Sequence, residues 1–309
     1  MAEKPNRAGV PSDTVLRDAE VAQAARDKLR FAVEYGVLAP GGHPWMIAIG
    51  ESAIDFRLGH RCERPIGDPI HRDAIIGCGI GLAQLKLALH QLGCIDSTIL
   101  LPEEDLQPDL LARIYIDRVE ANVDPQSFVL YQALYTPSSK VPRPIDAAFE
   151  EELVAHAQVE RAVLSFRPPH ELPPSEASAP CGAPTLGAVV RRLAWMESRV
   201  VQPGEVSSVG GEADLAAEGT IGAVIATKGD RPLDWIAAGQ ALARVALRAR
   251  VEGFFTQVGR ALQGARTERG EFAQIPLRIG VPRSAGEVAA QAGGTGHFFS
   301  QVPGRERSA

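Results

Sequence analysis

The chain has 309 residues, of which 45% are hydrophobic and 23% are charged. These proportions are ordinary for a globular protein, so they exclude collagen-like, coiled-coil and fully disordered chains, and the length allows two domains or one large one. The 38 acidic and 32 basic residues give a net charge of −6, which disfavours nucleic acid as a partner.

The N-terminal residues lack the apolar segment of a signal peptide, and no stretch approaches the roughly 18 to 20 apolar residues of a membrane-spanning helix. We therefore expect a cytoplasmic protein with no membrane partner. The cysteines form no C-x-x-C pair and no zinc-type cluster, so we expect buried thiols and no metal site. They are Cys62, Cys78, Cys94 and Cys181.

A polar tail over residues 1–22 precedes a first module in which helices and strands mix. Apolar residues at helical spacing, strand-like alternation and intervening glycines define its elements. Residues 72–92 are apolar on more than one helical face, which indicates a buried helix. The predicted elements in chain order are a helix over 24–36, a glycine-rich loop over 38–44, a hairpin over 46–56, the helix over 72–92, and strands over 97–101 and 111–116.

A second module of the same kind follows, and a tail over 284–309 ends the chain. Six prolines between residues 167 and 184 preclude a regular helix or a central strand there, so we expect an exposed lid. The elements predicted for this module are helices over 128–134 and 147–156, strands over 161–166 and 222–227, a helix over 235–252 and a strand over 275–280. Helices mixed with strands in this way predict an α+β fold.

The two long helices resemble each other at a constant offset of 160 residues, when residues 79–93 are laid on 239–253. Five positions are identical, and the strand over 112–116 resembles residues 277–281 at an offset of 165. The identical pairs are Gly79 and Gly239, Leu82 and Leu242, Ala83 and Ala243, Leu87 and Leu247, and Gly93 and Gly253. We interpret this similarity as an internal duplication, whose two copies would enclose ligand clefts along their pseudo-twofold interface.

Five segments carry a more specific pattern. They are Leu-Ala-Pro-Gly-Gly-His-Pro-Trp over 38–45, Asp-Pro-Ile-His-Arg-Asp over 68–73, the Gly-Cys-Gly helix start at 77–79, Gly-Asp with a following Trp-Ile-Ala-Ala-Gly-Gln-Ala-Leu over 229–242, and Arg-Ile-Gly over 278–280. Their order and spacing resemble the nitroreductase family, and within it the fused-repeat flavoproteins of the Acg type. The resemblance implies a nitroreductase-like pseudo-dimer of two fused repeats, over 23–122 and 123–283, that is monomeric or forms a homodimer.

The resemblance also implies an FMN-dependent oxidoreductase, with NAD(P)H as a possible co-substrate and a nitro, quinone or enone-like small molecule as substrate. Glycines in the first loop would let backbone N–H groups approach the flavin ring, and cations would hold its phosphate. The residues implied for FMN binding are Pro40, Gly41, Gly42, His43, Ser138, Ser139, Lys140, Arg143 and Arg278. No residue is assigned to catalysis. Arg72, beside Asp68 and Asp73, is expected to brace its connector.

Two segments depart from the family pattern. The family's Asn-x-Gln is missing because Pro44 follows His43 directly, and the Arg-rich phosphate segment has become Pro-Ser-Ser-Lys-Val-Pro-Arg over 137–143. These losses favour an alternative from another class of protein. In that alternative the chain is a flavin-poor or cofactor-free scaffold that acts as a sequestering, binding or stress-related protein.

Overall fold

The structure is a computed structural model, and its described part covers residues 45–50, 53–59, 72–92, 94–119, 125–135, 140, 142, 144–173, 215, 219–259, 262 and 264–281. Several predictions concern residues outside this part. They are the two tails, the helix over 24–36, the loop over 38–44 and the portion of the Pro-rich lid from 174 to 184.

The described residues form two antiparallel four-stranded sheets and four α-helices, so the predicted α+β class is confirmed. The elements are β1 (Trp45–Ile49), β2 (Ala53–Leu58), α2 (Arg72–Gln91), β3 (Cys94–Leu100), β4 (Leu110–Val119), α3 (Pro125–Tyr135), α4 (Ala147–Val159), β5 (Val163–Arg167), the short 3-10 helix η1 (Pro169–Glu171), β6 (Ile221–Thr227), α6 (Pro232–Val251), β7 (Phe255–Val258) and β8 (Phe272–Gly280).

The first sheet has the strand order β1-β2-β4-β3. Strands β1 and β2 form the predicted hairpin, in which Ile49 lies opposite Ile54. On β2, Ile54 and Phe56 are fully buried, as is Ile114 on β4, because these side chains belong to the main hydrophobic core. Their alternation with more exposed residues places one face of the sheet on the core.

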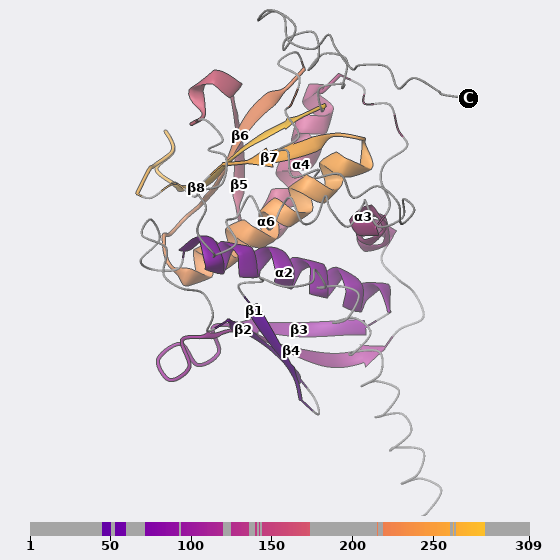
Figure 1. Ribbon diagram of the computed structural model, residues 1–309, viewed down its shortest axis with the longest axis vertical. Helices are drawn as coiled ribbons and strands as arrows, with labels where there is room; N and C mark the ends of the chain where they lie inside the picture. The colour runs from indigo at the N-terminus through magenta and orange to yellow at the C-terminus, as the bar shows by residue number, and fades with distance from the viewer. Residues whose placement is uncertain are drawn as a thin grey trace, which may run out of the picture.

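The second sheet has the order β5-β6-β8-β7, and α6 lies in the chain between β6 and β7 as α2 lies between β2 and β3. Each sheet therefore places its strands in the order first, second, fourth, third, with one 20-residue helix between the second and the third. Figure 1 shows α2 and α6 packed together between the two sheets, with sheet β1-β2-β4-β3 beyond α2 and sheet β5-β6-β8-β7 beyond α6.

The helices α2 and α6 cross at two glycines, Gly79 and Gly239. A Cβ atom built on Gly79 would overlap the carbonyl oxygen of Ile236, and one built on Gly239 would overlap that of Ile76. Each added Cβ would also lie 3.0 Å from the Cα of the other glycine. Both pairs, Gly79 with Gly239 and Ile76 with Ile236, are 160 residues apart in the sequence, so the contact is reciprocal.

Local capping explains why α6 begins three residues before its predicted start. Pro232 occupies the first turn, where its missing N–H removes no helical hydrogen bond. The side chain of Asp234 accepts hydrogen bonds from the backbone N–H groups of Arg231 and Gly229, each at 3.2 Å. The carboxylate therefore satisfies donors ahead of the helix and favours the positive end of its dipole.

Other sequence predictions can be checked in the described part. Cys78 and Cys94 are buried, as expected, whereas Cys62 and Cys181 lie outside that part. Trp45 and Trp235 are both buried in the core. Among the helices that the structure describes, none is long and apolar enough to cross a membrane.

His156 on α4 is buried in a positively charged environment. Burial, together with the charges of Arg244 and Arg248, lowers the pKa of His156 from 6.5 to about 4, although Glu152 opposes the shift. The imidazole of His156 therefore binds a proton near pH 6.5 in the unfolded chain, but only near pH 4 in the native protein.

We predict that His156 destabilises the native state in acid. Its contribution to the free energy of unfolding is zero above about pH 6.5 and becomes unfavourable by up to about 3 kcal/mol as the pH falls towards about 4. Urea unfolding of the parent protein and of His156→Gln across this pH range measures the difference in slope. Parallel pH profiles for the two proteins would contradict the prediction.

Candidate functional site

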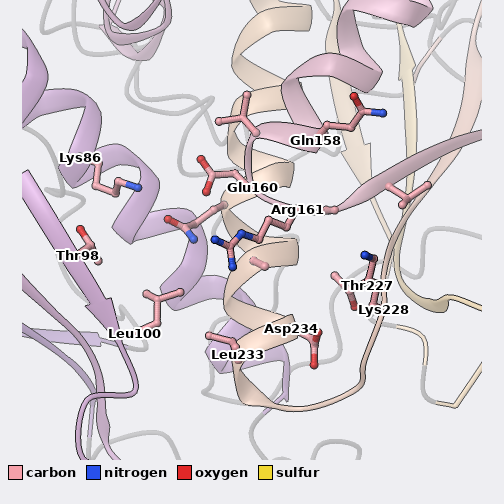
Figure 2. Close-up of a pocket in the computed structure, with 15 residues that line it drawn as sticks. Lys86, Thr98, Leu100, Gln158, Glu160, Arg161, Thr227, Lys228, Leu233 and Asp234 are labelled. Carbon is pink, nitrogen blue, oxygen red and sulfur yellow. The ribbon is translucent and has the colours of Figure 1, made fainter.

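A cavity of about 850 Å³ lies between the two sheet-and-helix units. Lys86 on α2 and Thr98 and Leu100 on β3 form one wall. The opposite wall comes from the turn between α4 and β5, the end of β6 and the first turns of α6. Figure 2 shows the side chains of Lys86 and Arg161 reaching into the space between these walls. The volume is in the range of small-molecule sites.

The cavity is bordered by three cations, which are Lys86, Arg161 and Lys228. Within the described part of the chain, no ion pair involves any of these three side chains. The two carboxylates of the lining are engaged elsewhere: Glu160 lies 3.8 Å from Arg244, and Asp234 caps α6. The lining therefore carries three positive and two negative side chains, which leaves an excess of one positive charge on this concave surface.

The cation at the tip of the turn has an uncommon backbone conformation. Arg161 has φ of 59°, in the left-handed region that glycine adopts without penalty. The turn closes the end of α4, because the N–H groups of Arg161 and Ala162 donate to the carbonyls of Gln158 and Ala157 at 2.9 and 3.3 Å. Glycine is the usual residue at such a helix end, so the chain places an arginine at the cavity where glycine would cost less.

A buried amide completes the polar lining. Gln240 on α6 is only 4% exposed, and its side-chain Oε1 is buried without a hydrogen-bond partner in the described part of the chain. A buried carbonyl oxygen that lacks a donor costs on the order of 1 to 3 kcal/mol. Leu100, Leu233 and Ala237 supply apolar surface nearby.

Only two of the residues implied for FMN binding are described, Lys140 and Arg278, and neither lines this cavity. The Nζ of Lys140 lies 2.9 Å from Oε1 of Glu252, and the lysine side chain is 53% exposed. The other implied residues, Pro40, Gly41, Gly42, His43, Ser138, Ser139 and Arg143, lie outside the described residues.

Arg278 holds the start of the Pro-rich segment. Its Nη2 donates to the carbonyl oxygens of Pro169, Leu172 and Pro173 at 3.2, 3.1 and 3.0 Å. The same segment packs on β6, where a Cβ on Gly222 would lie 2.8 Å from Leu172. Residues 169–173 are therefore anchored to the second sheet.

We predict that Arg278→Met loosens this anchor. Methionine keeps much of the apolar stem but removes the donor of three hydrogen bonds, so the amide hydrogens of His170, Glu171 and Leu172 should exchange roughly 10-fold faster or more. Hydrogen exchange measures the effect, with Arg269→Met as a control that removes an exposed arginine. Unchanged protection of the segment would contradict the prediction and would show that packing on β6 holds the segment in place without the hydrogen bonds of Arg278.

A buried ion pair joins the start of α2 to the turn between β6 and α6. The guanidinium of Arg72, which is 2% exposed, contacts the carboxylate of Asp230 with Nη2···Oδ1 of 3.0 Å and Nη1···Oδ2 of 3.3 Å. Asp230 also accepts a hydrogen bond of 2.7 Å from Nε1 of Trp235, and Arg72 donates to Gln274. Arg72 thus connects the start of α2 to Asp230 and to Gln274 on β8, whereas the connector that it was expected to brace lies outside the described residues. Asp68 lies outside the described residues.

Among the described residues, no group of three or more histidine, cysteine, aspartate or glutamate side chains could hold a metal ion.

Comparison of the sequence with protein-family models gives no match, and comparison with curated proteins gives no significant match.

Proposed function

We propose that the chain is a fused duplication of a nitroreductase-type half and functions as an FMN-dependent oxidoreductase. Bound FMN would accept a hydride from NAD(P)H and pass two electrons to a nitro, quinone or enone-like substrate. The chain's own residues would bind and orient the flavin at the interface of the two halves.

The reciprocal helix crossing is the observation that carries the duplication. Gly79 faces the turn of α6 that contains Ile236, and Gly239 faces the turn of α2 that contains Ile76. Such exchange of equivalent contacts is what a twofold interface produces. The identical strand orders of the two sheets support the same interpretation.

The strand registers support a flavin site at the loop before β1. Ile54 and Ile221 lie opposite Ile114 and Ile279, which the 165-residue repeat relates. We then count back along β1 from the residue opposite Ile54, and along β5 from the residue opposite Ile221. This count brings residues 41–43 into correspondence with residues 160–162. The second of these segments borders the cavity between the halves. By this correspondence, the glycine-rich loop would border the pseudo-symmetric cleft.

Of the two described cations implied for the phosphate, Lys140 fits that role and Arg278 fits it less well. The ammonium of Lys140 lies near the surface, so a phosphate could approach it beside Glu252. Nη2 of Arg278 donates instead to three backbone carbonyls. A phosphate held by Arg278 would have to compete with these bonds.

The absorption spectrum of the purified protein tests the proposed cofactor. A yellow protein with stoichiometric FMN, or a colourless one whose melting temperature rises on FMN titration, supports the proposal, since a ligand that binds the folded state must stabilise it. Lys140→Met should weaken FMN binding roughly 10-fold. A colourless protein whose melting temperature ignores FMN would overturn the proposal.

The hydrogen bonds of Arg278 to backbone carbonyls favour a second candidate function, a cofactor-free binding scaffold. In that case the long helices and both sheets are retained for packing, and the arginine serves only to anchor the Pro-rich segment. The same FMN titration separates the two candidates.

A further inference from the structure

We infer that the cavity between the halves binds a nucleoside monophosphate, a ligand separate from the proposed flavin. The inference rests on the charge of the lining, on the buried amide of Gln240 and on the mixed polar and apolar walls. It does not depend on the proposed oxidoreductase activity.

The charge of the lining selects an anion. Lys86 lies on α2, Arg161 on the turn after α4, and Lys228 at the end of β6, so cations from three separate segments face one cavity. Within the described residues no carboxylate pairs with any of them. A phosphomonoester carries close to two negative charges at neutral pH and accepts several charge-assisted hydrogen bonds, and the planar guanidinium of Arg161 can bind two of its oxygens.

The amide of Gln240 selects a ligand that also carries a hydrogen-bond donor. Its Oε1 lacks a partner in the described structure, and the residue borders the cavity. An N–H group of a ligand bound there would satisfy this oxygen once the Gln240 side chain turns towards the cavity, because the oxygen itself has almost no exposed surface in the structure. Nucleobases carry such N–H donors on their polar edges.

The size and walls of the cavity agree with a nucleoside attached to the phosphate. A volume of about 850 Å³ far exceeds the need of a phosphate ion alone. Leu100, Leu233 and Ala237 provide apolar surface against which a flat base can pack. A single ligand with a dianionic end, a flat apolar body and an N–H edge meets all three parts of the lining.

The decisive experiment is calorimetric titration of the full chain with the four ribonucleoside 5′-monophosphates, with adenosine and inorganic phosphate as partial ligands. We expect at least one monophosphate to bind with a Kd below about 1 mM, more tightly than either partial ligand, and with affinity that decreases as salt increases. The absence of binding by all four monophosphates would overturn the inference.

Two variants separate binding from folding. Arg161→Gly places glycine at a left-handed position, and Gln240→Leu removes the buried Oε1 that lacks a hydrogen-bond partner, so both should keep or raise the melting temperature. Both should nevertheless weaken monophosphate binding by roughly 10-fold or more. Arg269→Ala, which removes the same charge from an exposed turn, should leave binding unchanged.

The flavin content of the same variants distinguishes this inference from the proposed function. Unchanged flavin with weakened monophosphate binding supports two separate sites. Monophosphate binding by a protein that takes up no FMN supports the inference and overturns only the proposed function. Loss of FMN from Arg161→Gly and Gln240→Leu, with no monophosphate binding by the parent protein, would make the cavity the flavin site and overturn the inference.

Discussion

Gly239→Ala is expected to destabilise the protein by about 3 kcal/mol or more, although alanine favours a helix over glycine by about 1 kcal/mol. The added Cβ would overlap the carbonyl oxygen of Ile76, which the backbone of α2 holds in place. A side chain could rotate away, but a helical carbonyl cannot, so the two central helices would have to separate. Separation removes packing along the core between both sheets.

Gly79→Ala should behave in the same way, because its Cβ would overlap the carbonyl oxygen of Ile236. For each variant we expect a fall in Tm of roughly 6 to 12 °C, measured by calorimetry. Gly81→Ala is the matched control on the same helix: its Cβ would lie 3.0 Å from the ring of Trp45 and 3.1 Å from that of Phe56. These rings can shift, so the loss of stability in Gly81→Ala should be much smaller.

The pattern of the three variants also tests the duplication. A twofold contact predicts similar losses of stability at Gly79 and Gly239. Gly79 meets the carbonyl of Ile236, and Gly239 meets the carbonyl of the equivalent residue, Ile76. If one of the two variants keeps the parent Tm while the other does not, the two sides of the helix crossing do not contribute equally to stability, which would count against a twofold contact.

Periodicity predicted the long elements well because burial dominates their sequences. Helix α2 was expected over 72–92 and runs over Arg72–Gln91, with most of its faces buried. Strand β7 was missed because Phe255–Val258 has only four residues, too few for a recognisable alternation. It becomes a strand through pairing with β8, which no local pattern reveals.

The candidate cavity could not be predicted for a related reason. Lys86, Arg161 and Gln240 come from three distant segments, and each looks like an ordinary helix or turn residue in the sequence. Arg161 gives no warning of its left-handed backbone, because glycine is the usual signal for that conformation. Arg278, by contrast, was selected by family resemblance as a residue of the FMN site, which stays a prediction, and the described structure adds a contact with the Pro-rich segment that its sequence neighbours do not suggest.

The ion pair between Arg72 and Asp230 shows the same limit, since its partners are 158 residues apart. Asp230→Ala is expected to lower the free energy of unfolding by about 3 to 5 kcal/mol, because it leaves a guanidinium that is only 2% exposed without this carboxylate. Arg72→Met should cost less. Asp230 is 23% exposed, so water can reach it, and Trp235 still donates to it.

A double-mutant cycle isolates the pair from the packing around it. Chemical unfolding of the two single variants and of Arg72→Met/Asp230→Ala gives the coupling energy, and we expect about 1 to 3 kcal/mol. The double variant should be more stable than Asp230→Ala alone, because it no longer buries a guanidinium that has lost the carboxylate of Asp230. Purely additive losses would contradict this, and would mean that Arg72 and Asp230 stabilise the packing of α2 against α6 and β8 through their other contacts, such as those with Gln274 and Trp235.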